Sequence, residues 1–193
     1  LLDDVGVAVD ARNRDRRTAL MFACKTGQCA VVSHLLAAQA DPTLRMKDES
    51  TAFDWAVLSG DEATMNLLAD HPLVDIAAMN RFGCAAVQWA AAAGSVTSLC
   101  WLQRRGLSLS HLNEANHGAV MKAAWRGHGS ALQWLLLDAE GPRLVSQLFV
   151  RDVEGNTVAD AARTNGKGDI ATWLESVARE IQRESRPPTT EGS

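Results

Sequence analysis

The sequence lacks several features that define common classes of protein. Its four cysteines include no C-x-x-C pair, so we expect free thiols in a reducing compartment, at Cys24, Cys29, Cys84 and Cys100. No apolar run approaches the roughly 18 residues of a membrane helix. The net charge of −4 at pH 7 is too small to indicate a nucleic-acid or membrane partner by itself. These absences favour a cytoplasmic or nuclear protein.

Signatures of catalysis are missing as well. The Gly-Lys dipeptide at 166–167 has neither the upstream glycine nor the following Ser or Thr of a phosphate-binding loop. No group of Cys and His residues has the spacing of a structural zinc site. Asp54 and Asp160 stand where helices are expected to start, and a carboxylate there accepts backbone N–H bonds. We therefore predict no enzyme activity, no metal and no cofactor.

The chain does contain one pattern written several times. A glycine recurs at steps of 33, 34, 33 and 39 residues, as Gly27, Gly60, Gly94, Gly127 and Gly166. Nine residues before each glycine lies an expected helix start, and eight residues after it lies a leucine. Three landmarks at fixed offsets in five units indicate a stacked repeat.

Each unit predicts a helix, a tight turn and a second helix. The hydroxyls of Thr18, Thr51 and Thr157 can cap the first helix of their units. The recurring glycine then ends that helix in the left-handed conformation. The second helix has apolar residues at helical spacing, as in Val32, Leu35 and Leu36.

The segments TALMFACKTG, TAFDWAVLSG and TVADAARTNG, with LLAAQADP, resemble the motifs of the ankyrin-repeat family over roughly residues 1–175. The resemblance implies an all-α repeat solenoid of stacked helix-turn-helix units with β-hairpin-like connecting loops. We expect a domain at 1–182, with a partial repeat at 1–12, five units that start near 13, 46, 80, 113 and 152, and a disordered polar tail at 183–193. The partial first repeat and the absence of an initiating Met predict a fragment of a longer protein.

The repeats depart from the family pattern in two ways. Arg16, Glu49 and Asn116 replace the turn glycine, and a left-handed conformation costs Arg or Glu about 1–2 kcal/mol there. Six residues are inserted within 138–152, where the pattern predicts a short helical turn. We expect Leu144, Leu148 and Phe149 to pack back, and a surface elaboration is favoured over a binding loop.

In the family, a partner usually lies against the hairpin tips and the first-helix face of a concave groove. In this chain those positions are rich in Lys and Arg in the first units, and they include the aromatics Phe82 and Trp125. The predicted contact residues are therefore Arg14, Arg17, Lys25, Arg81, Phe82, His117, Trp125 and Arg126. Trp and Arg are frequent interface hot spots. We expect Arg81, Phe82, Trp125 and Arg126 to anchor an acidic and partly apolar peptide. A solvated basic rim is the alternative.

Other aromatics have a structural interpretation. Phe22, Trp55 and Trp89 lie one position further in and are expected to be core residues. Trp101, Trp134 and Trp173 share a position on the second helices, toward the convex back. There we expect them to seal the seams between units, although a second docking face is the alternative.

The resemblance implies a monomeric protein-interaction module, a scaffold or adaptor with a protein or peptide partner. An alternative is a recognition segment within a larger enzyme, such as a kinase or a ubiquitin-ligase component. A nucleic-acid binder is disfavoured, because the basic residues are thinly spread and the net charge is negative.

Overall fold

A computed structural model describes residues 8–184. Within that range the chain forms ten α-helices and one 3₁₀ helix, η1, and no strand. The elements are α1 (Ala19–Lys25), α2 (Cys29–Ala37), α3 (Ala52–Ser59), α4 (Glu62–Ala69), α5 (Ala86–Ala93), α6 (Val96–Arg104), α7 (Ala119–Arg126), α8 (Gly129–Leu136), η1 (Val145–Phe149), α9 (Val158–Thr164) and α10 (Gly168–Glu184).

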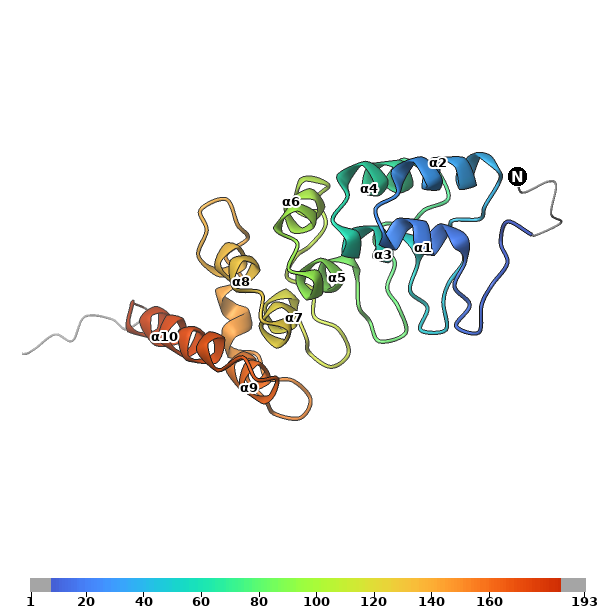
Figure 1. The fold of residues 1–193 in the computed structure, drawn as a ribbon. Coiled ribbons are helices and arrows are strands. Elements are labelled where there is room, and N and C mark those ends of the chain that lie inside the picture. Colours follow the sequence, from blue (N-terminus) through green and yellow to red (C-terminus); the bar gives the residue numbers. More distant parts are fainter. Residues whose placement is uncertain (1–7, 185–193) are drawn as a thin grey trace, which may run out of the picture.

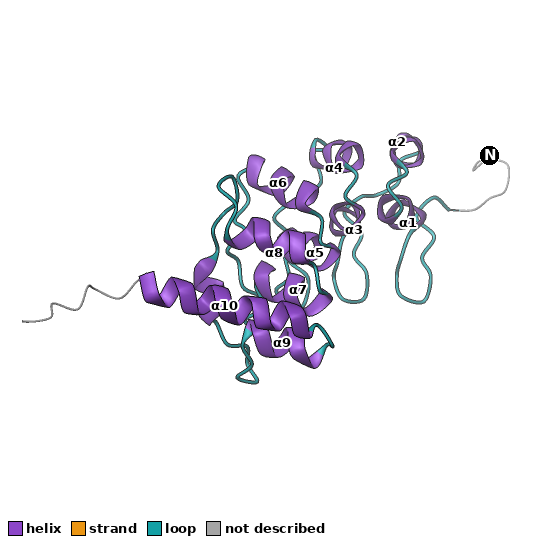
Figure 2. Cartoon of the chain, turned by 60° about the vertical axis from the view of Figure 1, so that its left-hand side comes forward, coloured by secondary structure: helices purple, strands orange, loops and turns teal. Residues whose placement is uncertain are grey.

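The helices form two rows. The first helices of the units pack on one another in chain order, α1 on α3, α3 on α5, α5 on α7 and α7 on α9. The second helices α2, α4, α6 and α8 form the neighbouring row, above α1, α3 and α5 in Figure 1. Figure 2 shows α1 and α3 nearly end-on beneath α2 and α4. The expected all-α stack of repeats is confirmed.

The loops that join the units project from the row of first helices, and we call them tip loops. In the loop at 80–84, the Asn80 N–H donates to the Cys84 carbonyl at 3.0 Å and closes a hairpin-like turn. The N–H of Arg81 donates to the carbonyl of Asp48 in the preceding tip loop, also at 3.0 Å. Equivalent bonds join the other neighbouring tip loops. The tips therefore form one hydrogen-bonded row without assigned strands among residues 8–184.

Local chemistry at the helix ends follows the predicted pattern. Thr18, Thr51 and Thr157 accept the expected N–H bonds at the starts of α1, α3 and α9. All five recurring glycines have positive φ angles, between 64° and 86°. Arg16 and Glu49 hold the left-handed turn conformation at φ 62° and 67°. The predictions for these positions are confirmed.

The sequence predicts that Phe22, Trp55 and Trp89 are core residues. The prediction is confirmed for Trp55, which is buried, and is wrong for Phe22. Phe22 is 44% exposed, because no earlier first helix among the described residues covers α1 on that side. Its ring packs edge-on against Trp55 with centroids 5.6 Å apart. Trp89 is half-buried.

Two of the three tryptophans of the second helices seal seams, as expected, whereas Trp173 is half-buried. Trp101 and Trp134 are buried. The indole N–H of Trp101 donates to the Asn66 side chain of α4 at 2.9 Å, and the Arg105 guanidinium lies 4.9 Å from the centre of its ring. A buried aromatic with its N–H bonded across the seam joins two units rather than awaiting a partner.

The inserted segment is more than a surface elaboration, and that expectation is wrong. Leu144 and Leu148 are buried as expected, whereas Phe149 is 45% exposed. Gln147 of η1 is also buried. Its Oε1 accepts the Val120 N–H at 3.1 Å, and its Nε2 donates to the Ser110 carbonyl at 3.3 Å.

The two ends of the described chain differ from the expected boundaries. Helix α10 continues to Glu184, so residues 183–184 of the expected disordered tail are helical. Residues 1–7 of the expected partial repeat and residues 185–193 of the tail lie outside the described residues. In the described part, no helix is both long and apolar enough to cross a membrane.

Candidate binding groove

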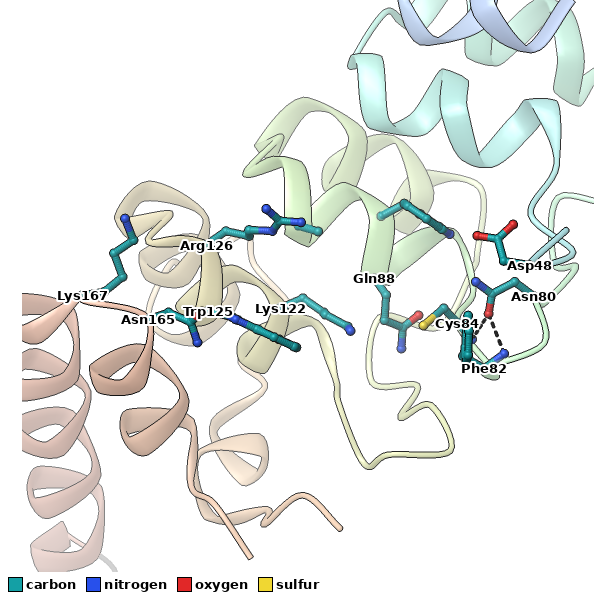
Figure 3. Close-up of a pocket in the computed structure, with 12 residues that line it drawn as sticks. Asp48, Asn80, Phe82, Cys84, Gln88, Lys122, Trp125, Arg126, Asn165 and Lys167 are labelled. Atoms are coloured by element: carbon teal, nitrogen blue, oxygen red, sulfur yellow. Dashed lines mark hydrogen bonds between the residues drawn. The ribbon is translucent and has the colours of Figure 1, made fainter. Parts of the chain in front are cut away.

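A groove of about 630 Å³ lies over the first helices α5 and α7, between the tip loops and the start of α10. Phe82, Trp125 and Arg126, three of the four predicted anchors, line it together. Phe82 is 54% exposed and Trp125 is 39% exposed. Figure 3 shows Trp125 and Lys122 extending from α7 toward the side on which Phe82 lies.

Arg81, the fourth predicted anchor, sits beside the groove rather than in it. Its backbone is fixed by the bond to Asp48, and its side chain is exposed. No carboxylate of the described residues lies within ion-pair distance of its guanidinium. Arg81 is therefore a rim residue with an unpaired charge.

The tip of Phe82 is fixed by an asparagine. The Asn80 Oδ1 accepts the N–H groups of Phe82 and Cys84, each at 3.0 Å (Figure 3). An Asn side chain that accepts bonds from the backbone two and four residues on stabilises a tight turn. The Asn80 side chain therefore holds the loop that presents Phe82 to the groove.

Helix α7, which carries Lys122, Trp125 and Arg126, has an unusual start. Its N-cap is Gly118, which has no side chain to accept a bond, and Gln147 of the inserted segment supplies the acceptor instead. A Cβ atom at Gly118 would lie 2.2 Å from the Gln147 Oε1, so any other residue there would displace the Gln147 amide. The insertion and Gly118 together hold the start of the helix that contributes Lys122, Trp125 and Arg126 to the groove.

A second hollow of about 270 Å³ lies on the other side of Trp125, between the last tip loop and α9. His117, Asp152 and Glu154 line it, and Trp125 is common to both hollows. His117 packs edge-on against Trp125, with ring centroids 5.6 Å apart. The predicted contact residue His117 is thus a half-buried support of Trp125.

Lys122 lies between these groups. Its Nζ is 5.2 Å from the centre of the Trp125 ring and 3.5 Å from the His117 Nδ1. Burial lowers the pKa of His117, and the Lys122 ammonium lowers it further, although Asp152 opposes the shift from 3.6 Å. His117 is therefore neutral at pH 7, and it brings no charge to the second hollow.

Lys167 completes the basic side of the groove, and the prediction missed it. A Cβ atom at Gly127 would lie 2.8 Å from the Lys167 Cδ, which shows that the lysine stem crosses over this glycine. Asp61 and Ser95 pack over Gly27 and Gly60 in the same manner. Asp61, Ser95 and Lys167 each come directly after the recurring glycine of their own unit. The position of Lys167 in the repeat could therefore have predicted that it covers the glycine of the preceding unit.

Arg17 and Lys25, also predicted contact residues, lie elsewhere. Both cations stack on the buried Trp55, with the Arg17 Cζ at 5.2 Å and the Lys25 Nζ at 5.0 Å from the ring centre. Arg17 also pairs with Asp15 at 3.5 Å. Arg14 is exposed on the same tip loop. The basic surface predicted as one groove is therefore two separate clusters.

Metal binding and acid–base catalysis have little support in the described part of the chain. It contains no group of three or more His, Cys, Asp or Glu residues arranged to hold a metal ion. The buried Asp54 accepts the Thr51 N–H at 2.8 Å and the Thr51 hydroxyl at 3.1 Å. Burial raises the pKa of Asp54 to about 6. Its bonds make it a helix cap.

Comparison with known proteins agrees with this fold. Residues 1–56 match the family model described as ankyrin repeats (many copies). The chain is 30% identical over 135 residues to Ankyrin repeat domain-containing protein 63 of Homo sapiens, and 32% identical over 139 residues to the Mus musculus protein of the same name. The chain belongs to the ankyrin-repeat family. Ankyrin repeats generally bind other proteins, and they are typically not catalytic.

These relatives are much longer than this ankyrin-repeat chain. Each alignment covers 70% of the chain, but only 28% of the human protein and 27% of the mouse protein. The likeness therefore concerns the repeats.

Proposed function

We propose that this ankyrin-repeat chain is a scaffold or adaptor that binds an acidic and partly apolar segment of a partner protein in the groove over α5 and α7. The observation that carries the proposal is the exposure of Phe82 and Trp125 in one hollow beside Lys122 and Arg126. Exposed aromatics next to cations are what such a segment would contact.

The energetics favour Trp125 as the central anchor. Aromatic side chains bury large areas, and Trp and Arg are enriched among residues whose truncation weakens binding most. Neighbouring contacts mainly exclude water. In the proposed complex, Phe82 and Trp125 hold an apolar side chain, while Arg126 and the rim residue Arg81 attract acidic ones. Arg14 contributes at most a peripheral contact.

We further propose that residues 1–182 act as one monomeric domain whose first-helix row presents the groove. The continuous row of hydrogen bonds between tip loops supports this, because it fixes each tip relative to the next. A groove built on rigid neighbours loses little entropy when a partner binds.

The test is a pull-down from a lysate of the source cells, with the wild type beside Trp125→Ala and bound proteins identified by mass spectrometry. The matched control is Phe149→Ala, which removes an aromatic of similar exposure that does not line the groove. We expect a protein that binds the wild type and the control but not Trp125→Ala. Identical profiles for all three proteins would contradict the proposal.

A further inference from the structure

Trp125 separates two hollows of opposite charge. On one side, Lys122, Arg126 and Lys167 line the larger groove. None of the three lies within ion-pair distance of a carboxylate of residues 8–184. One carboxylate, Asp48, lines the same groove, next to the loop of Phe82. The side nearest Trp125 is therefore basic and uncompensated.

The smaller hollow on the other side is acidic. Asp152 is bonded to its own loop, since its Oδ1 accepts the N–H groups of Glu154 and Asn156 at 3.0 and 2.8 Å. Burial alone would raise the pKa of Asp152, but hydrogen bonds from Asn156, Glu154 and His117 outweigh it and lower the pKa. No Lys or Arg of the described chain pairs with Asp152 or Glu154, and His117 is neutral. The hollow thus carries two carboxylates without a paired Lys or Arg, of which Asp152 is largely buried and Glu154 is exposed.

The inference rests on the proposed function and extends it. We infer that the bound segment is extended and dipolar: it crosses Trp125 with a carboxylate side chain on the Lys122, Arg126 and Lys167 side and a Lys or Arg side chain on the Glu154 side. Between them, one apolar residue packs on Trp125. An extended chain advances about 3.3 Å per residue, so charged residues two to four positions apart, on either side of the apolar one, lie roughly 7 to 13 Å from each other.

Complementary charge explains why the segment would bind in one direction. Reversing it would place a carboxylate beside Asp152 and Glu154 and a cation beside Lys122 and Arg126, and like charges disfavour the wrong partner. A wholly acidic segment would satisfy only the basic side. The structure therefore favours a bound segment with acidic and basic residues in a fixed order over a segment that is only acidic.

Four fluorescein-labelled peptides of about nine residues, each with a central leucine, probe this directly. Their flanks are Glu then Lys, Lys then Glu, Glu on both sides, and Lys on both sides. Fluorescence anisotropy measures binding to the wild type. We expect one mixed-charge peptide to bind about fivefold more tightly than the all-Glu peptide, because each exposed ion pair adds little.

The decisive variant carries Arg126→Glu and Glu154→Lys together, which lowers the summed charge of Lys122, Arg126 and Lys167 from +3 to +1 and brings that of Asp152 and Glu154 from −2 to 0. Both residues are exposed, so the fold should survive, and a circular dichroism melt checks this. The double variant should therefore lose most of the order preference and bind the two mixed peptides with similar affinity. The control exchange Glu180→Lys with Arg183→Glu, at the end of α10, should leave the wild-type preference unchanged.

Other outcomes overturn the inference in distinguishable ways. Equal binding of the all-Glu and mixed peptides would overturn the dipolar segment and leave the proposed acidic partner standing. An unchanged order preference in the double variant would also overturn it. If no peptide binds, or if binding persists in Trp125→Ala, the inference fails and the proposed groove is contradicted as well.

Discussion

The chain pairs a lysine with a tryptophan twice, with opposite results. In the first two units, Lys25 of α1 reaches across to Trp55 of α3, and Arg17 and Phe22 cover the same ring. In the fourth unit, Lys122 and Trp125 lie three residues apart on α7. Trp55 is 4% exposed and Trp125 is 39% exposed.

The two residue types have exchanged positions in the repeat. Lys25 and Trp125 both lie two residues before their unit's glycine, and Trp55 and Lys122 both lie five residues before it. Trp55 at the inner position packs between units, whereas Trp125 at the outer position stays on the surface. Position alone does not bury an aromatic, because Phe22 is also at the inner position and is 44% exposed. The comparison shows that the cover supplied by the preceding unit separates a structural aromatic from a candidate contact.

Truncating Trp55 and Trp125 should give the largest difference in stability between the two regions. Trp55→Ala removes a buried aromatic and should lower the free energy of unfolding by about 3–5 kcal/mol. Trp125→Ala should change it by less than about 1 kcal/mol, because the ring is partly exposed. Urea denaturation measures both values. Equal losses would show that Trp125 is a structural residue.

The helix starts of the two regions differ as well, since α3 is capped by its own Thr51 and α7 by the distant Gln147. Gln147→Ala should lower the free energy of unfolding by about 1–3 kcal/mol, because it leaves the Ser110 carbonyl and the Val120 N–H without their partner. Gln133→Ala, at an exposed site on α8, is the control and should change it by less than about 0.5 kcal/mol. A Gln147 variant as stable as this control would contradict the capping role.

Asp54 and Asp160 occupy the same repeat position, and their pKa values should move in opposite directions. Burial raises the pKa of Asp54 to about 6, whereas hydrogen bonds from Thr157 lower that of the exposed Asp160 carboxyl. Carbon-detected NMR titration of the carboxyl groups measures both. Similar midpoints for the two would contradict the difference in burial.

The Asp54 shift also predicts how stability depends on pH. Its folded pKa lies above the unfolded value of about 4, so the protonated folded form is favoured. The stabilisation is fully present below about pH 4 and is lost as the pH rises through about 6. Asp54→Asn should remove this part of the pH dependence in denaturation experiments, and an unchanged profile would contradict it.

The smallest expected effect concerns the turns beside the two clusters. Arg16, next to Arg17, and Asn116, next to His117, both have the left-handed backbone conformation. Arg16→Gly should raise the free energy of unfolding by about 0.5–1 kcal/mol, because it relieves strain but adds unfolded-state entropy. Asn116→Gly should gain less, since Asn tolerates this conformation. Thermal melts compare them, and a lower melting temperature for Arg16→Gly would contradict the strain.

Local features of the fold could be predicted from the sequence, because they depend on neighbours in the chain. The threonine caps, the left-handed glycines and the strained Arg16 and Glu49 are of this kind. The period then gave the stacking order, since similar units pack in similar ways.

The candidate site could be predicted only in part, because it depends on which side chains of the next unit cover a given residue. Phe82, Trp125 and Arg126 were found by their repeat positions, and they line one groove. The stacking of Arg17 on Trp55, and the exposure of Phe22, depend on contacts between units that the period does not specify. Gln147 lies in an insertion that has no counterpart in the other units.

The most direct test of the contrast between the exposed Trp125 and the buried Trp55 uses 5-fluorotryptophan and ¹⁹F NMR. Each of the six tryptophan signals is assigned by substitution. The Trp125 signal should shift more than that of Trp55 between H₂O and D₂O, because it is the more exposed. When the partner identified by pull-down is added, the Trp125 signal should move and the Trp55 signal should stay. A Trp125 signal that is insensitive to both solvent and partner would contradict the account.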